Sequence, residues 1–108
     1  MDLAGFLAAR LGEKEAWARK LIADWEPPAI WHSLGQQMLR EAAAGRAILA
    51  LHRRRSTEFI DADGDDRTSY DCPECRNHGL PDSWPCKTLR IGAAVHGDHP
   101  GYQQEWKP

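Results

Sequence analysis

The sequence predicts a mainly α protein with a long αα-hairpin, a zinc-knuckle-like segment and a short third helix. Two observations support this. Apolar residues recur at helical spacings over two long stretches separated by a pair of prolines, and three cysteines gather in the second half of the chain. A chain of 108 residues has the length of one domain. We therefore expect a single domain over 1–108, with a helical hairpin at 2–52, a mobile acidic loop at 53–70 and a metal-binding segment at 71–108.

The first helix is expected over residues 2–25. Asp2 is a suitable N-cap, and Pro27 and Pro28 end the helix because they cannot continue its hydrogen-bond ladder. Its apolar stripe consists of Leu3, Phe6, Leu7, Leu11, Ala18, Leu21, Ile22 and Trp25.

The second helix is expected from about Ala29 to about His52. The small-residue run at 41–45 would let another helix approach closely, so the two helices and the proline turn predict an αα-hairpin. Its apolar stripe consists of Ile30, Trp31, Leu34, Met38, Ala42, Ile48 and Leu49.

Periodicity is lost in the next segment, where the basic run Arg53–Arg55 precedes the acidic run Asp61–Asp66. This composition predicts a loop, with at most a short extended piece at 57–60. A third helix is expected from about Cys86 to about His96, where apolar residues return before Gly97.

Composition and patterning exclude several classes of protein. No stretch approaches the ~18 consecutive apolar residues of a membrane span, so we expect no contact with a membrane. The first residues carry an acid where a signal peptide needs a basic region, which favours a cytoplasmic location. An odd number of cysteines then argues for metal ligands or reduced thiols and against a disulfide framework.

The cysteines have the spacing of a metal site. Cys72 and Cys75 form a C-x-x-C knuckle, and Cys86 lies at the expected start of the third helix, where free N–H groups favour a thiolate. Three thiolates need one further ligand to close a tetrahedral structural zinc (Zn²⁺) site. Iron and cobalt accept the same ligands, and zinc is preferred for its general prevalence.

Five histidines compete for the fourth position. His52 is favoured because it ends the second helix and would fasten the hairpin to the C-terminal segment. His78 follows because it lies just past the knuckle, where chelation strains a short turn, and His99 is third because it must fold back. His32 and His96 are the least suitable candidates.

Other chemistries fit the motifs less well. A nucleoside-deaminase site lacks its glutamate after His52, an EF-hand lacks its glycine and glutamate positions, and a thioredoxin-like pair lacks a preceding strand. The candidate nucleic-acid contacts are Arg53, Arg54 and Arg55, but a net charge of −2 and the acidic run nearby make this the minority interpretation.

The C-terminus resembles a family of small proteins of actinobacteria and their phages that contain a domain of unknown function. The resemblance rests mainly on three motifs: Trp84-Pro85-Cys86-Lys87-Thr88-Leu89-Arg90, Asp98-His99-Pro100-Gly101-Tyr102 and Glu105-Trp106-Lys107-Pro108. Family members carry a cysteine pair ahead of the Trp-Pro-Cys element and tend to have a histidine where His52 stands. The resemblance thus implies that the three cysteines act together, strengthens the case for His52, and implies no reaction.

These observations predict a small intracellular binding protein that is stabilised by zinc and is not an enzyme. We expect a protein partner, with the role of a phage accessory factor acting on a host protein. Nucleic-acid binding is the alternative, and a metalloenzyme with an open zinc site is a third and weaker one. Exposure of Trp17 or Trp31 would favour protein binding.

Overall fold

The computed structural model describes residues 2–23, 29–77 and 79–108. The chain divides into two compact units, Met1–Ala50 and Leu51–Pro108. The boundary between them lies close to residue 52, where the sequence predicts the end of the helical hairpin. The single domain expected from the length of the chain stays a prediction.

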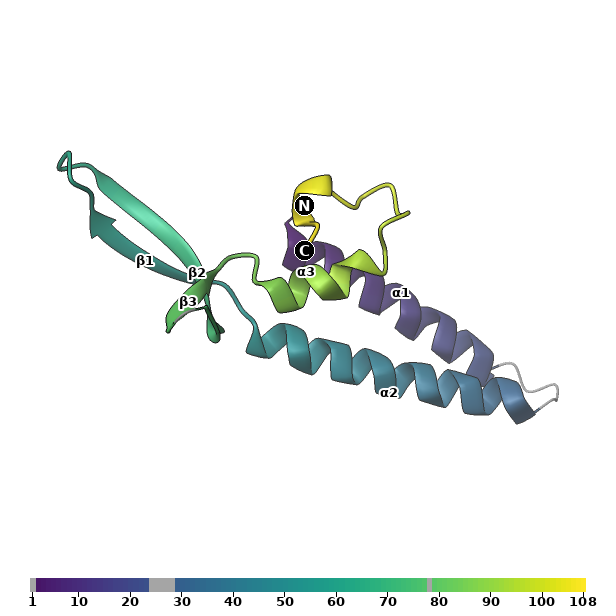
Figure 1. Ribbon diagram of the computed structural model, residues 1–108. Coiled ribbons are helices and arrows are strands. Elements are labelled where there is room, and N and C mark those ends of the chain that lie inside the picture. The colour runs from purple at the N-terminus through teal and green to yellow at the C-terminus, as the bar shows by residue number, and fades with distance from the viewer. Residues whose placement is uncertain (1, 24–28, 78) are drawn as a thin grey trace. The chain divides into compact units, whose positions relative to one another are not determined.

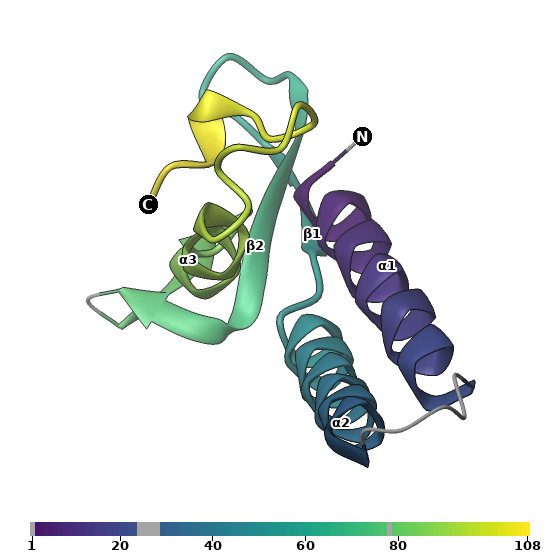
Figure 2. The ribbon, with the colours of Figure 1, turned by 90° about the vertical axis from the view of Figure 1, so that its right-hand side faces the viewer.

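The first unit is the predicted αα-hairpin. Helix α1 spans Leu3–Ala23 and helix α2 spans Ala29–Leu51, and the two lie side by side in both views (Figures 1 and 2). The carboxylate of Asp2 accepts a hydrogen bond from the backbone N–H of Gly5 at 2.8 Å, so the predicted N-cap is confirmed. The proline turn and Trp25 lie outside the described residues.

Small residues set the closest approach of the two helices. A Cβ atom added to Gly35 would lie 2.7 Å from the backbone oxygen of Ala18, and one added to Gly45 would lie 2.6 Å from the Leu11 side chain. Ala18 and Ala42 are fully buried. The close approach expected at the small-residue run of α2 is therefore confirmed. Ion pairs between Lys14 and Glu41 and between Glu15 and Arg46 also join α1 to α2.

The second unit combines a small antiparallel sheet with short helices. Its elements are strands β1 (Arg55–Ile60), β2 (Asp66–Asn77) and β3 (Leu80–Ser83), helix α3 (Lys87–Ala94) and the 3-10 helix η1 (Gln104–Trp106). The strand order is β1-β2-β3. Helix α3 contacts η1, and the rings of Tyr102 and Trp106 meet edge to face at 5.7 Å. The mainly α prediction thus holds for the helices but missed the sheet.

The extended piece predicted at 57–60 is confirmed as part of β1, but the loop predicted over the rest of 53–70 is wrong, because β1 and β2 form a β-hairpin there. The backbone N–H of Gly64 donates a hydrogen bond to the carbonyl of Asp61, and the backbone N–H of Asp61 donates one to the carbonyl of Asp65. Gly64 has a φ of +80°. This is a three-residue hairpin turn with glycine in the left-handed position. The Asp61 carboxylate accepts N–H bonds from Asp63 and Asp65 and pairs with Arg67. The acidic run therefore forms a turn.

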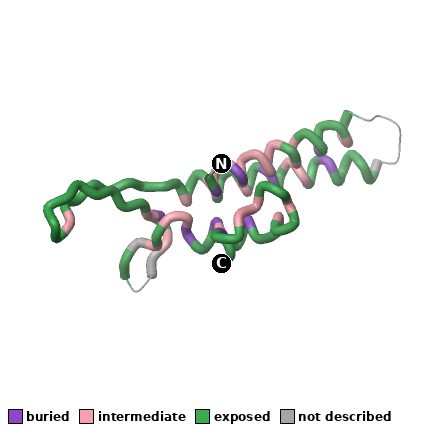
Figure 3. Tube along the Cα trace, turned by 90° about the horizontal axis from the view of Figure 1, so that it is seen from above, coloured by how far each residue is buried: buried purple, intermediate pink, exposed green. Residues whose placement is uncertain are grey.

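Few side chains of the second unit are buried. Figure 3 shows β1 and its turn as almost wholly exposed. Among the described residues of this unit, the buried hydrophobic side chains are Cys72, Cys86, Leu89, Ala93 and Trp106. Two of these five are cysteines, so the sulfurs form a large part of the interior.

A membrane-crossing segment is absent from the described part of the chain, where every helix is too short or too polar to cross a bilayer.

Replacing Gly35 with alanine should destabilise the hairpin. The new methyl group would meet the Ala18 carbonyl, and such overpacking costs about 1–3 kcal/mol, which outweighs the gain in helix propensity. Gly12→Ala is the matched control in α1, because its nearest neighbour is the end of the Arg46 side chain at 4.0 Å. Urea unfolding followed by far-ultraviolet circular dichroism should show Gly35→Ala less stable and Gly12→Ala as stable as wild type or more so. Equal stabilisation by both substitutions would contradict this packing.

Candidate metal centre

Four side chains of the second unit meet with metal-binding atoms facing one another. They are His52, Cys72, Cys75 and Cys86, and their ligand atoms all lie within 4.8 Å of one another. Cys72 and Cys86 are buried, whereas His52 and Cys75 are partly exposed. These are the three predicted cysteines with the favoured histidine.

The C-x-x-C motif lies in an irregular part of β2. Cys72 is opposite Asp82 of β3, but Arg76 is already opposite Pro81, so 73–75 have no partners on β3. Such a bulge disrupts the ladder locally and bends the strand, and Pro73 fits there because it has no N–H to donate. The Sγ atoms of Cys72 and Cys75, on either side of Pro73 and Glu74, lie within 4.8 Å of each other.

Cys86 is the N-cap of α3, as the sequence predicts. The preceding Trp84–Pro85 peptide bond is cis. Asp82 accepts a hydrogen bond from the backbone N–H of Lys87 at 2.9 Å, which satisfies one of the unpaired donors of the first turn. Asp82 was missed in the sequence because it lies four residues before the N-cap, where no spacing rule marks a residue as a cap.

His52 follows the last residue of α2 and presents its Nδ1 atom to all three sulfurs. Nδ1 lies 3.4 Å from the Sγ of Cys72, 3.3 Å from that of Cys75 and 3.7 Å from that of Cys86. With ordinary bond lengths, a tetrahedral zinc ion holds a nitrogen and a sulfur ligand about 3.6 Å apart. The measured distances are close to this value, so the donor set fits a single ion of this size.

Cys86 is held where a negative charge is costly. Burial raises the pKa of the Cys86 thiol to about 12, and the neighbouring thiols of Cys72 and Cys75 also raise it, while the backbone N–H of Leu89 acts in the opposite direction. Since a buried thiolate needs a positive charge close by, the same site favours a bound cation.

The Thr88 hydroxyl gives the cluster an outer partner. Its Oγ1 atom lies 3.5 Å from the Sγ of Cys75. A cysteine thiolate can only accept a hydrogen bond, so the hydroxyl would donate to it. Thr88 was also missed as a partner of the cysteines, although it stands in the Trp84–Arg90 motif, because no spacing relates it to Cys75.

One family model covers the whole chain. It is the Family of unknown function (DUF6221), and it matches residues 1–108. The chain belongs to this family. No curated protein and no solved structure matches this chain.

The other described histidines of this DUF6221 chain are not members of the cluster. The Nδ1 atom of His99 accepts a hydrogen bond from the backbone N–H of Gly101 at 2.8 Å. His32 lies exposed on α2, His96 follows α3, and His78 lies outside the described residues. Among the histidines that the structure describes, His52 alone lies with the three cysteines, and its role as a metal ligand stays a prediction.

The three arginines predicted as nucleic-acid contacts have different surroundings. Arg55 belongs to β1 and makes a two-point ion pair with Asp71, at 2.9 and 3.2 Å. The guanidinium of Arg54 lies 4.5 Å from the centre of the Tyr70 ring, and Arg53 is exposed. Two of the three thus contact neighbours within their own hairpin.

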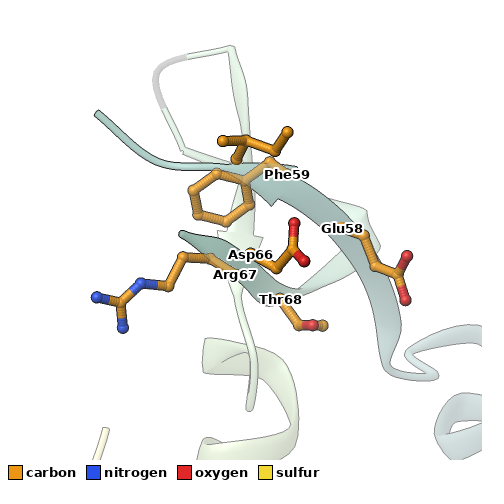
Figure 4. A pocket seen from close by; sticks show the side chains of 6 residues that line it. Glu58, Phe59, Asp66, Arg67 and Thr68 are labelled. Carbon is orange, nitrogen blue, oxygen red and sulfur yellow. The ribbon is translucent and has the colours of Figure 1, made fainter. Parts of the chain in front are cut away.

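A hollow of about 410 Å³ lies beside the turn of the β1–β2 hairpin (Figure 4). Its lining comes from both strands and consists of Glu58, Phe59, Ile60, Asp66, Arg67 and Thr68. None of the four cluster residues lines it, so it is not a substrate pocket of the candidate metal centre.

Removing the outer hydroxyl should weaken metal binding. In Thr88→Val the sulfur of Cys75 loses its hydrogen-bond donor, and losses of this kind lower metal affinity by about tenfold or more. Competition titration of Co²⁺ against a chelator measures the change, with Thr68→Val, on the exposed surface of β2, as the matched control. Unchanged affinity in Thr88→Val would show that the hydroxyl does not support the centre.

Proposed function

We propose that this chain is a small non-enzymatic binding protein whose second unit is built around one structural zinc ion. The observation that carries the proposal is the convergence of one nitrogen and three sulfur atoms from His52, Cys72, Cys75 and Cys86. Zinc is the common occupant of a Cys₃His set, although iron and cobalt accept the same ligands.

The closed donor set supports a structural role. A catalytic zinc ion usually has three protein ligands and leaves the fourth position to water, whereas four protein ligands complete the tetrahedron. The four ligands come from the end of α2, the bulge of β2 and the start of α3. The ion would therefore fasten three segments of a unit whose described part buries few side chains.

The hairpin unit supplies the surface that supports a protein partner. Trp17 is 58% exposed and Trp31 is 47% exposed, and Ile30 and Leu34 are exposed on the same helix as Trp31. Large exposed apolar side chains favour an interaction site, and tryptophan is enriched among the residues that dominate binding energy. An accessory role of a phage protein on a host protein is part of this proposal.

Nucleic-acid binding through Arg53–Arg55 is the weaker proposal. Arg55 is neutralised by Asp71, and the chain has a net charge of −2. The proposal of a metalloenzyme is the weakest of the three, since catalysis would require a water molecule to replace one of the four ligands.

The protein should bind one zinc or cobalt ion per chain. The Co²⁺ form should show the absorption of a tetrahedral ion with thiolate ligands, because three sulfurs and one nitrogen surround the site. His52→Ala and Cys75→Ser should each weaken Co²⁺ binding strongly, and Cys75→Ser should also unfold the second unit.

His32→Ala is the control for these variants, since His32 lies exposed on α2 and outside the cluster. Its spectrum and stoichiometry should equal those of the wild type. Protein purified without chelator that contains no stoichiometric metal, and that takes up none on titration, would contradict the metal site.

Truncating an exposed tryptophan should impair partner binding. Trp17→Ala and Trp31→Ala remove side chains that the fold leaves exposed, so the protein should stay folded. A residue that anchors an interface contributes about 2 kcal/mol, or roughly thirtyfold in affinity. Quantitative affinity capture from the native cell should recover a protein with the wild type and with the control Val95→Ala, and much less with the tryptophan variants. Equal recovery with all four, or recovery of no stoichiometric protein, would contradict a partner site on this unit.

A further inference from the structure

We infer that β1 pairs with β1 of a second copy of this chain, antiparallel and about a twofold axis, so that one sheet runs through the dimer. The inference concerns the hairpin of β1 and β2 and stands independently of the metal site.

The outer side of β1 is an open sheet edge. The strand order is β1-β2-β3, so β1 has a neighbour on one side only. All six of its residues are exposed, and Ile60 is 70% exposed. Unpaired backbone groups along an exposed strand are a template for another strand. A strand added there would bond to the open groups of this edge.

The hairpin turn determines which backbone groups face outward. The hydrogen bond from the Asp61 N–H to the Asp65 carbonyl marks a bonded pair next to the turn. Bonded and non-bonded pairs alternate along an antiparallel ladder, so Arg55, Thr57 and Phe59 bond to β2. The N–H and C=O groups of Ser56, Glu58 and Ile60 therefore point to the open edge.

The charged side chains along β1 are suited to pairing with a second copy of the strand. Arg55 pairs with Asp71, and Arg67 pairs with Asp61 within the hairpin. Glu58 makes no ion pair with any residue that the structure describes, and Arg54 contacts the Tyr70 ring without a carboxylate partner there. The edge thus carries an unmatched cation at its beginning and an unmatched anion four residues later.

An antiparallel twofold pair brings these charges together. In a register centred on a residue, that residue lies opposite its own copy across the twofold axis. Because bonded and non-bonded pairs alternate, only such registers align open N–H groups with open C=O groups. Of the registers centred on a residue of β1, only the one centred on Ser56 places Arg54 directly opposite Glu58 of the second copy, and symmetry makes this contact twice. A register centred on Glu58 would set two carboxylates against each other, which destabilises a pair. Charge complementarity therefore selects the register centred on Ser56.

Sedimentation equilibrium over a concentration series tests the pairing on the full chain as purified. The wild type should form a reversible dimer. Ser56→Pro should be a monomer with unchanged circular dichroism and metal content, because it removes an N–H that points to the open edge and not one that bonds to β2. A wild type that stays monomeric at every concentration would overturn the inference, as would a Ser56→Pro variant that dimerises normally.

Charge reversal tests the register. Glu58→Arg should raise the dimer dissociation constant about tenfold, because two attractive contacts become repulsive. The double variant Arg54→Glu with Glu58→Arg should recover the wild-type constant. Glu105→Arg carries the same change of charge away from β1 and should leave the constant unchanged. If the double variant binds no more tightly than Glu58→Arg alone, the proposed register is wrong.

Discussion

The meeting of three sulfurs and one imidazole nitrogen is the constraint on which the second unit depends. The atoms come from the residue after α2, the bulge of β2 and the N-cap of α3. Cys72 and Cys86 are also two of the few buried side chains among the described residues of this unit. A small unit buries too little apolar surface to be stable on packing alone, so its interior and its candidate metal site are largely the same group of atoms.

The β1–β2 hairpin explains how His52 reaches the cysteines. Twenty residues separate it from Cys72 in the sequence, but the register places Arg55 directly opposite Asp71. The two strands therefore carry the chain out and back, and return it beside its starting point. The ion pair between Arg55 and Asp71 lies at the base of this hairpin, next to the cluster in the sequence. Strand pairing brings His52 to the three cysteines.

Local chemistry made most of the site predictable from the sequence. The C-x-x-C spacing and the position of Cys86 at a helix start depend on neighbouring residues only, and so does the Asp2 cap. The hairpin of β1 and β2 was missed because both faces of β1 are exposed, which removes the alternation that identifies a strand. The sequence did indicate the hairpin through its turn, because Asp63-Gly64 provides the left-handed glycine of a short hairpin turn. The interpretation as an acidic loop gave composition more weight than this dipeptide.

The length of the hairpin exceeds what the cluster requires. A tight turn soon after residue 52 would also return the chain to Cys72, yet six residue pairs extend from Arg55 and Asp71 to Ile60 and Asp66. These pairs carry no buried side chains on β1, and an isolated two-stranded ribbon is only marginally stable in water. Ordering such a ribbon costs conformational entropy that its own packing does not offset. A neighbouring strand on the open edge would supply further hydrogen bonds, which is the physical reason to place a second copy of β1 there.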